Sequence, residues 1–291
     1  MATVMDCKAL SDKIIKDLKE RVKKLNAKGK AVGFAAIVVG DESDSTIYVH
    51  EKEKACKDIG IFSETIHLPA SATQRELEAR IDSVMRDGKI DGAIIQLPLP
   101  VTLDTDKALI RIFPEKDIDG LHVNNIGRLS RNQKGLFPCA TKGILQLLQE
   151  YEITMEGKNA VVIGKSNIIC KPVAMMLLNQ GCNVTVCDPL TENIADITSE
   201  ADILVVSVGI PDFVTAAMVK EGATVIDAGY NEIEGGVVGD VDFDAVEPIA
   251  GYITTVPDGI LEMNVTMMMQ NLVEKAENMY HNSYNGNIYE V

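Results

Sequence analysis

The sequence has too few basic residues for a protein that binds nucleic acid or anionic membranes nonspecifically. Its apolar runs are too short for a membrane-spanning protein. It contains 28 Lys and Arg against 43 Asp and Glu, a formal net charge of −15. Nonspecific binding to nucleic acid or to anionic membranes needs clustered positive charge, so we expect neither partner. No apolar run reaches the ~20 residues of a membrane-spanning helix. The first residues, Met-Ala-Thr-Val-Met-Asp, lack the apolar core of a signal peptide, so a cytoplasmic protein is expected.

The cysteines and histidines show no metal-binding or disulfide pattern. The six cysteines include no C-x-x-C pair, and the four histidines are scattered along the chain. Zinc sites and redox motifs need closely spaced ligands, so we expect reduced thiols and no bound metal. The 291 residues are enough for one large domain or two medium ones.

Helix-period and strand-period segments alternate along almost the whole chain, which predicts an α/β fold. Apolar residues recur at helical spacing from Leu10 to Leu25, and an apolar, strand-like run follows at 32–39. Thr73 and Glu76 have the spacing of a capping box, which predicts the start of another helix. Residues 92–96 are typical of a buried strand, so a parallel sheet is expected in this half of the chain.

The second half contains the most informative stretch. An apolar run ends at Gly164 and is followed by Lys165, Ser166 and a helix with a proline in its first turn; a second apolar run ends at Asp188. Glycine permits the close approach of a ligand, and a helix start presents unpaired N–H groups to an anion. This is the order of a dinucleotide-binding βαβ unit. The spacing differs from G-x-G-x-x-G, so the motif alone is also compatible with an ordinary βα turn.

Three features of the first half are candidates for a ligand site. Tyr48 and Lys52 are four residues apart, which on a helix places an aromatic ring and an amine on one face. Gln96 ends the predicted strand, so its amide lies at the carboxyl edge of the sheet, where open α/β sheets bind ligands. Asp119 lies in a charged turn further along. Each feature taken alone also fits a solvated helix face, a strand exit or a plain turn.

In this order, these elements resemble the bifunctional methylenetetrahydrofolate dehydrogenase/methenyltetrahydrofolate cyclohydrolase family. The motifs extend from about Ile37 to Phe243 and read Y-V-H-E-K, D-G-A-I-I-Q-L-P-L-P, P-E-K-D-I-D-G-L-H, G-R-L, V-V-I-G-K-S-N-I, V-I-D-A-G and G-D-V-D-F. The resemblance implies a folate-binding catalytic domain formed by residues 1–140 and 265–291. It also implies a Rossmann-like domain, a doubly wound parallel sheet, formed by residues 141–264, and a homodimer.

The resemblance also implies an activity and a set of site residues. Oxidation of 5,10-methylenetetrahydrofolate with a nicotinamide cofactor gives 5,10-methenyltetrahydrofolate, and its hydrolysis gives 10-formyltetrahydrofolate, a step of one-carbon metabolism and purine biosynthesis. The catalytic positions carry over to Lys52, Gln96 and Asp119. The substrate-binding positions are these three with Tyr48, Leu97, Pro257 and Gly259, and the cofactor-binding positions are Gly164, Lys165, Ser166, Asp188 and Tyr230. A partly desolvated amine can move protons when water adds to the methenyl cation, and a carboxylate can accept paired N–H donors of the pterin.

The sequence departs from the family pattern on the cofactor side. Cys170 replaces a glycine that continues the family's cofactor turn. Asp188 replaces a serine or basic residue that helps to bind a 2′-phosphate. A carboxylate there accepts a bond from a free ribose hydroxyl and repels a 2′-phosphate, whereas Lys165 could pair with that phosphate. The resemblance to the family and Lys165 favour NADP as the cofactor. NAD is the alternative because of Asp188.

The largest departure is in residues 256–264, where the family's V-P-G-G-V-G-P-M-T reads V-P-D-G-I-L-E-M-N. Asp258, Leu261 and Glu262 replace two glycines and a proline in a loop that the family places beside substrate and nicotinamide. Residues 138–143 also differ from the family's P-C-T-P-x-G. Two alternatives therefore stay open: a cyclohydrolase with weak or lost dehydrogenase activity, and a non-catalytic folate- or nucleotide-binding paralogue.

Overall fold

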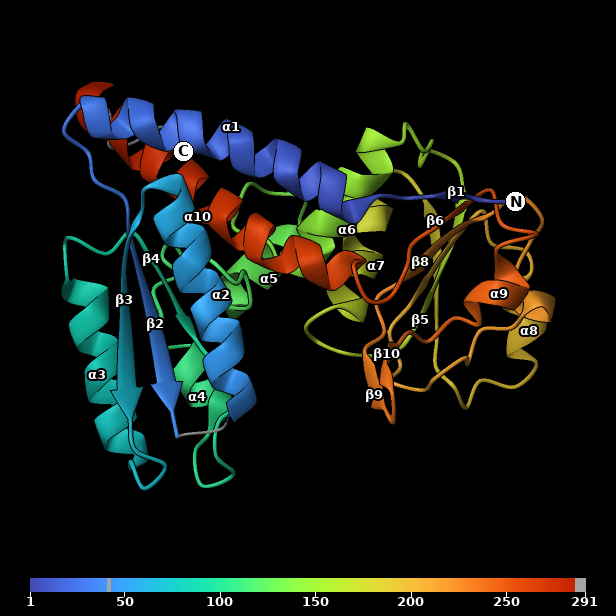
Figure 1. Ribbon diagram of the computed structural model, residues 1–291, viewed down its shortest axis with the longest axis horizontal. Helices are drawn as coiled ribbons and strands as arrows, with labels where there is room; N and C mark the ends of the chain where they lie inside the picture. The colour runs from blue at the N-terminus through green and yellow to red at the C-terminus, as the bar shows by residue number, and fades with distance from the viewer. Residues whose placement is uncertain (41–42, 286–291) are drawn as a thin grey trace. The chain divides into compact units, whose positions relative to one another are not determined.

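Two parallel sheets, each with its own helices, form the framework of the protein (Figure 1). The computed structural model describes residues 1–40 and 43–285, and of residues 43–48 and 279–285 it describes the backbone only. The described chain divides into two compact units. The three-stranded unit comprises residues 13–128, 134–137 and the chain from Val265 onward, and the six-stranded unit comprises residues 1–12, 129–133 and 138–264.

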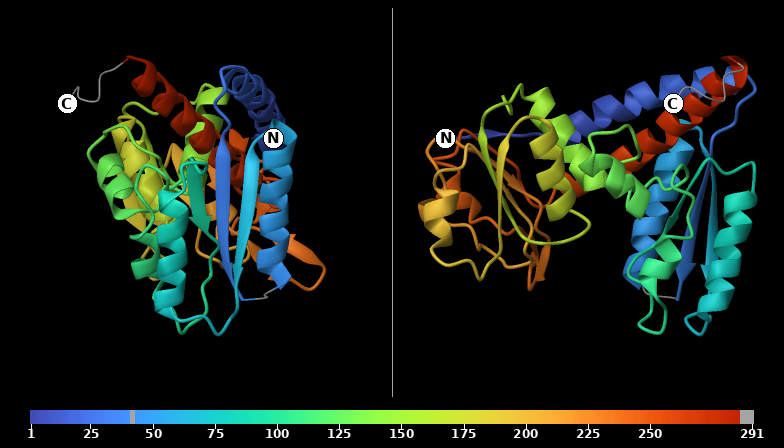
Figure 2. Two further views of the ribbon diagram at one scale, coloured as in Figure 1. Left: turned by 90° about the vertical axis from the view of Figure 1, so that its left-hand side faces the viewer. Right: turned by 180° about the vertical axis from the view of Figure 1, so that it is seen from behind.

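The three-stranded unit has a wholly parallel sheet with β2 in the centre. Its strands lie in the order β3 (Phe62–Leu68), β2 (Gly33–Val39) and β4 (Gly92–Ile95). The helices that contribute to this unit are α1 (Cys7–Ala27), α2 (Ser43–Ile59), α3 (Gln74–Arg86), α4 (Thr105–Leu109), α5 (Val123–Ser130) and α10 (Ile260–Asn285). The views in Figure 1 and Figure 2 agree in placing the sheet between α2 and α3.

Side chains alternate between the two faces of β2, so each face packs against different partners. Ala35, Ile37 and Val39 belong to one apolar core together with residues of α3 and α4. Helix α10 packs closely on β4, because a Cβ added at Gly92 would lie 2.9 Å from Leu272 Cδ1. Strands β2 and β4 are therefore buried, as the nearly continuous apolar sequence of β2 indicates, whereas most residues of the edge strand β3 are exposed or half-buried.

The six-stranded unit has the topology of a dinucleotide-binding fold. Its parallel strands lie in the order β1 (Thr3–Val4), β11 (Tyr252–Ile253), β8 (Thr224–Asp227), β7 (Ile203–Val206), β5 (Asn159–Ile163) and β6 (Asn183–Cys187). A separate hairpin joins β9 (Asn231–Ile233) and β10 (Gly236–Val238). The helices are α6 (Cys139–Glu150), α7 (Cys170–Asn179), α8 (Ile194–Thr198), α9 (Phe243–Val246) and the 3-10 helix η1 (Ala216–Met218).

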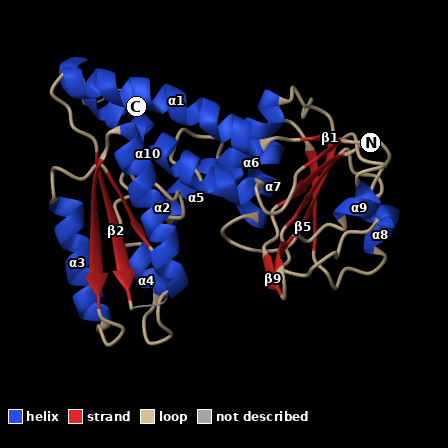
Figure 3. Ribbon diagram, viewed as in Figure 1, coloured by secondary structure: helices blue, strands red, loops and turns tan. Residues whose placement is uncertain are grey.

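Helices cover both faces of this sheet, which makes it doubly wound. Residues of α8, α9 and η1 share one apolar core with alternate residues of β5, β7 and β8, and α6 and α7 lie on the other side (Figure 3). The chain passes from β5 to β6 on one side and returns to β7 on the other side of β5. Ligands of such sheets bind at the carboxyl ends of the strands where the order reverses, here β5 and β7.

The predicted two-domain α/β fold with a parallel sheet is confirmed, but several boundaries differ, among them those of residues 129–133, which also lie in the six-stranded unit. Residues 1–12, expected in the folate-binding domain, lie in the six-stranded unit, because Thr3 and Val4 pair with β11. The last helix begins at Ile260, before residue 265, where the second segment of the folate-binding domain was expected to begin. Leu261 and Glu262 favour this longer helix, since leucine is a good helix former and an acidic side chain suits the first turn.

Candidate active site

Lys52 and Gln96 are joined at the carboxyl edge of the three-stranded sheet. Lys52 Nζ, on α2, donates a hydrogen bond of 2.7 Å to Gln96 Oε1. Gln96 directly follows β4, and its Nε2 donates to the Leu97 carbonyl oxygen at 2.9 Å. Its backbone N–H donates to the Ile37 carbonyl oxygen at 2.9 Å. Because the amide nitrogen is engaged by Leu97, the amide oxygen is left to face the lysine.

Asp119 lies in the same electrostatic neighbourhood. It follows the turn that pairs Asp117 with Ala93 of β4 in an isolated parallel bridge. Desolvation raises the pKa of Asp119 to about 6; the charge of Lys52 lowers it and that of Asp117 raises it. Lys52, Gln96 and Asp119 therefore belong to one unit: a hydrogen bond joins the amine and the amide, and the carboxylate of Asp119 lies within electrostatic range of the amine.

Two buried side chains that the motifs did not indicate, Asp117 and Asn271, hold the turn before Asp119. Asp117 is 2% exposed and accepts hydrogen bonds from the His122 N–H at 2.8 Å and from Asn125 Nδ2 at 2.9 Å. Desolvation raises the pKa of Asp117, and these hydrogen bonds oppose the rise. The only sequence signal was the first aspartate of P-E-K-D-I-D-G, which by itself is a turn signal.

Asn271, on α10, is the second of these side chains and holds the backbone of the turn. Its Nδ2 donates to the Ile118 carbonyl oxygen at 2.9 Å and to the Phe137 carbonyl oxygen at 3.0 Å, and the residue is 1% exposed. In the sequence, an asparagine on the apolar face of a methionine-rich helix would have indicated a buried polar contact. The last helix thus fixes the backbone next to Asp119.

The other expected substrate positions are distributed over both units. Tyr48 is in α2, one turn before Lys52, but its side chain lies outside the described residues. Leu97 is half-buried and packs against the core beneath β2 and β4. Pro257 and Gly259 belong to the six-stranded unit, whereas Lys52 belongs to the three-stranded unit.

The altered loop has one position that needs glycine and one strained position. A Cβ at Gly259 would lie 2.1 Å from the Thr255 carbonyl oxygen, so no side chain fits there. Asp258, which replaces a family glycine, has a φ of 69°. That left-handed conformation is uncommon for residues with a side chain, although Asp tolerates it better than most. The loop therefore keeps a glycine-like backbone while presenting a carboxylate.

The turn after β5 is built for close backbone approach. Gly164 has a φ of +126°, and a Cβ there would lie 2.4 Å from the Ser207 carbonyl oxygen and 2.5 Å from Cys170 Sγ. Ser166 Oγ accepts hydrogen bonds of 3.1 Å from the N–H groups of Ile169 and Cys170 at the start of α7. The Cys170 thiol is fully buried and lies 3.3 Å from the Ser207 carbonyl oxygen, so this departure fills the core beneath the turn.

Lys165 and Asp188 form an ion pair at the neighbouring strand ends. The hydrogen bond from Lys165, and after it that from the Leu190 N–H, lower the pKa of Asp188. Tyr230 follows β8, is 40% exposed, and its hydroxyl lies 3.4 Å from Glu232 Oε1. These residues fit a dinucleotide, because a turn that opens with glycine at the reversal of strand order is joined by an exposed ammonium group.

Comparison with known proteins agrees with this geometry. The model of the tetrahydrofolate dehydrogenase/cyclohydrolase catalytic domain matches residues 5–119, and that of the family's NAD(P)-binding domain matches residues 138–280. The bifunctional protein FolD of Halalkalibacterium halodurans is 43% identical over 276 residues, covering 95% of this chain and 99% of that protein.

Two solved structures are similar over nearly the whole chain. The bifunctional FolD methylenetetrahydrofolate dehydrogenase/cyclohydrolase of Campylobacter jejuni has a TM-score of 0.94 at 43% identity, covering 96% of this chain and 100% of that one. The Trypanosoma brucei N5,N10-methylenetetrahydrofolate dehydrogenase-cyclohydrolase, complexed with NADP cofactor and inhibitor, has a TM-score of 0.91 at 35% identity, covering 96% and 98%.

The fold and the site define an α/β protein that combines a dinucleotide-binding unit with a unit carrying a lysine, a glutamine and an aspartate. The two matched domains together cover most of the sequence. The chain belongs to the tetrahydrofolate dehydrogenase/cyclohydrolase family. Within the described residues, no helix combines the length and apolarity needed to span a bilayer.

Proposed function

We propose that this protein oxidises 5,10-methylenetetrahydrofolate to 5,10-methenyltetrahydrofolate with NADP and hydrolyses the product to 10-formyltetrahydrofolate. The observation that carries the proposal is the hydrogen bond of 2.7 Å between Lys52 Nζ and Gln96 Oε1, with Asp119 in the same electrostatic neighbourhood. Membership of the family supplies the reaction, and these three residues supply groups suited to it.

The first step needs positioning more than acid–base help, because a hydride leaves the one-carbon bridge directly. NADP, when bound, accepts that hydride. We assign its binding to Gly164, Lys165, Ser166, Asp188 and Tyr230. Pro257 and Gly259 are assigned to the substrate side of the six-stranded unit.

The second step requires proton movement. Water adds to the methenyl carbon and loses a proton, and a C–N bond then opens as its nitrogen gains one. Lys52 is the group that moves these protons, and Gln96 orients it through the hydrogen bond between them. The ionised carboxylate of Asp119 accepts paired N–H donors of the pterin, an arrangement that gives strong, charge-assisted bonds. Tyr48 and Leu97 complete the substrate-binding set, with Tyr48 against the aminobenzoyl ring.

The proposal includes a homodimer in the cytoplasm. The resemblance to the family supports the dimer, and the six cysteines, all buried and free among the described residues, suit a reducing compartment. Sedimentation of the purified protein measures the dimer directly.

An absorbance assay for methenyltetrahydrofolate tests the activity. Formation with NADP followed by decay is the expected result. Decay alone would leave a cyclohydrolase without dehydrogenase activity, and neither process with retained folate binding would identify a non-catalytic paralogue.

The variant Lys52→Met tests the role of the amine. Hydrolysis of methenyltetrahydrofolate should fall by about two orders of magnitude or more, the usual contribution of a positioned acid–base group. Folate binding should persist, because Met retains most of the length of the side chain. Lys54→Met, on an exposed position of the same helix, is the matched control. Undiminished hydrolysis in Lys52→Met would remove the lysine from the mechanism.

A further inference from the structure

Two residues with opposite preferences for the cofactor ribose lie at adjacent strand ends of the six-stranded unit. Ile163 of β5 pairs with Cys187 of β6, and the Gly164 N–H donates to the Cys187 carbonyl oxygen at 2.8 Å. Lys165 and Asp188 follow directly on these neighbouring strands. In dinucleotide-binding folds this edge recognises the adenosine ribose: a carboxylate accepts from a free 2′-hydroxyl, and a cation pairs with a 2′-phosphate.

The structure shows what the two groups do to one another. Lys165 Nζ pairs with Asp188 Oδ2, and Asp188 Oδ1 accepts the Leu190 N–H at 2.8 Å. The Asp188 backbone N–H in turn donates to Thr191 Oγ1 at 3.0 Å. The carboxylate is thus held in place by its own turn, and its charge is balanced by the lysine.

The two partners differ in how readily they can move. The side chain of Asp188 is 20% exposed and that of Lys165 is 68% exposed. Exposed ion pairs contribute little to stability, so a ligand group can separate this one at small cost. The long lysine side chain is the partner free to turn toward a phosphate.

We infer that the Lys165–Asp188 pair makes the ribose site tolerant of both NADP and NAD. A 2′-phosphate draws Lys165 away from Asp188, and the bound phosphate then meets one cation and one anion. A free 2′-hydroxyl donates to Asp188 while the lysine still balances the carboxylate. Because each charge offsets the preference of the other, neither cofactor is strongly excluded. The inference rests on the proposed function only for its assignment of this turn to the nucleotide.

Nucleotide fragments test the ribose site apart from catalysis. We would measure by calorimetry the binding of 2′,5′-ADP and of 5′-AMP, which carry and lack the 2′-phosphate, to the full-length protein and its variants. The unchanged protein should bind the two with affinities within about tenfold of each other, since a single exposed cation gives a modest preference. Neither fragment carries nicotinamide or folate, so the result does not depend on turnover.

The two single variants should move the preference in opposite directions. Lys165→Met should weaken 2′,5′-ADP by about tenfold and leave 5′-AMP within about threefold. Asp188→Asn should strengthen 2′,5′-ADP by about threefold to tenfold, because it removes a repelling charge while its amide oxygen still accepts the Leu190 N–H. The double variant should return the ratio of the two affinities toward that of the unchanged protein.

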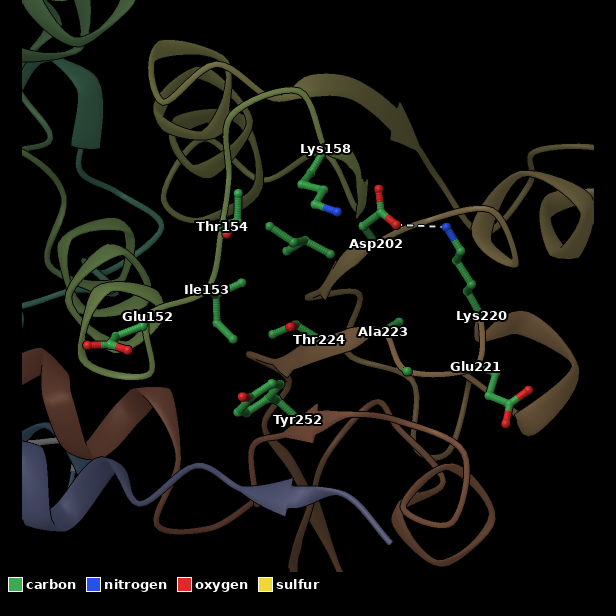
Figure 4. Close-up of a pocket in the computed structure, with 12 residues that line it drawn as sticks. Glu152, Ile153, Thr154, Lys158, Asp202, Lys220, Glu221, Ala223, Thr224 and Tyr252 are labelled. Atoms are coloured by element: carbon green, nitrogen blue, oxygen red, sulfur yellow. Dashed lines mark hydrogen bonds and ion pairs between the residues drawn. The ribbon is translucent and has the colours of Figure 1, made fainter.

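A second lysine–aspartate pair of the same sheet is the matched control. Lys220 Nζ and Asp202 Oδ1 are 2.7 Å apart, and both residues line a pocket of about 270 Å³ at the amino ends of β7 and β8. Figure 4 draws this pair among the residues that line the pocket. Lys220→Met and Asp202→Asn make the same charge changes at the edge opposite the proposed nucleotide site, and the affinity ratio should not change. The inference is overturned if Lys165→Met and Asp188→Asn leave the ratio unchanged, shift it in the same direction, or act no differently from the controls. It is also overturned if neither fragment binds the unchanged protein.

Discussion

The carboxylate of Asp119, a proposed site residue, lies where desolvation disfavours its charged form. Its pKa is raised to about 6 mainly because the carboxylate is desolvated, whereas an aspartate in an unfolded chain has a pKa of about 3.9. The folded state therefore binds the proton more tightly than the unfolded state does. The contribution of Asp119 to the free energy of unfolding should therefore rise as the pH falls from about 7 through the folded pKa and level off below the unfolded one.

Binding of the folate should have the opposite pH dependence. In the role proposed for Asp119 its ionised carboxylate accepts the N–H donors of the pterin, so affinity should fall as the pH drops below about 6. Asp119→Asn should raise the melting temperature at pH 7 and weaken folate binding, a trade-off expected where a site stores an unfavourable charge. Thermal unfolding and folate titration at pH 5 and pH 7 measure both effects.

The exposed Asp106→Asn in α4 provides the comparison for Asp119→Asn. It makes the same chemical change in the same unit and should alter neither the melting temperature at pH 7 nor folate binding. A loss of stability at pH 7 in Asp119→Asn would contradict the account of a desolvated carboxylate.

Motifs located the groups of the candidate site but not the residues that hold them. Lys52 and Gln96, which were both named as catalytic positions from their motifs, are in contact at 2.7 Å. Asp117 and Asn271 were not anticipated, because their importance comes from burial and from contacts with distant segments, which residue spacing does not encode. The ion pair between Lys165 and Asp188 was missed for the same reason, although each residue had been singled out.

Among the elements, those with a strong local signal were the easiest to predict. The capping box at α3 is present, since Thr73 Oγ1 accepts the Glu76 N–H and the Glu76 carboxylate accepts the Thr73 N–H. Strand β1 has only two residues, and the β9–β10 hairpin only three in each strand, so neither is long enough to show a period. Their pairing is decided by the rest of the unit.

Helix α10 stabilises the three-stranded unit through one polar side chain as well as its apolar face. Asn271→Leu, which keeps the branched shape of the side chain but is bulkier, would leave the carbonyl oxygens of Ile118 and Phe137 without this donor. Each buried group that loses its partner costs about 1–3 kcal/mol, so we expect a loss of about 2–4 kcal/mol in the free energy of unfolding. Urea unfolding measures the loss.

The same substitution at Asn278, an exposed position of α10, should change the free energy of unfolding by less than about 0.5 kcal/mol. Equal effects of Asn271→Leu and Asn278→Leu would show that helix propensity, rather than the two carbonyl contacts, accounts for the loss. Folate binding in Asn271→Leu should also weaken, since Ile118 is next to Asp119.

In the molecule as a whole, neither unit is a continuous segment of the chain. The three-stranded unit takes residues from three parts of the sequence, and so does the six-stranded unit. Helices α1 and α10 each contribute residues to both. Composition and periodicity predicted two α/β domains, but the exact division depends on pairings such as β1 with β11, which join residues far apart in sequence.

This division predicts how fragments of the chain will fold. Residues 13–137 contain all three strands of the smaller sheet but lack α10, so Asn271 and Leu272 no longer cover the turn and β4. Without that apolar cover the fragment should not unfold cooperatively. Residues 138–264 keep five of the six strands of the larger sheet and lack the two-residue β1, so this fragment should unfold cooperatively, with a lower melting temperature than the full chain. Circular dichroism during heating and urea titration distinguishes the two behaviours.

A cooperative transition of fragment 13–137 matching that of the full chain would mean that α10 is dispensable to the smaller sheet, contrary to its contacts there.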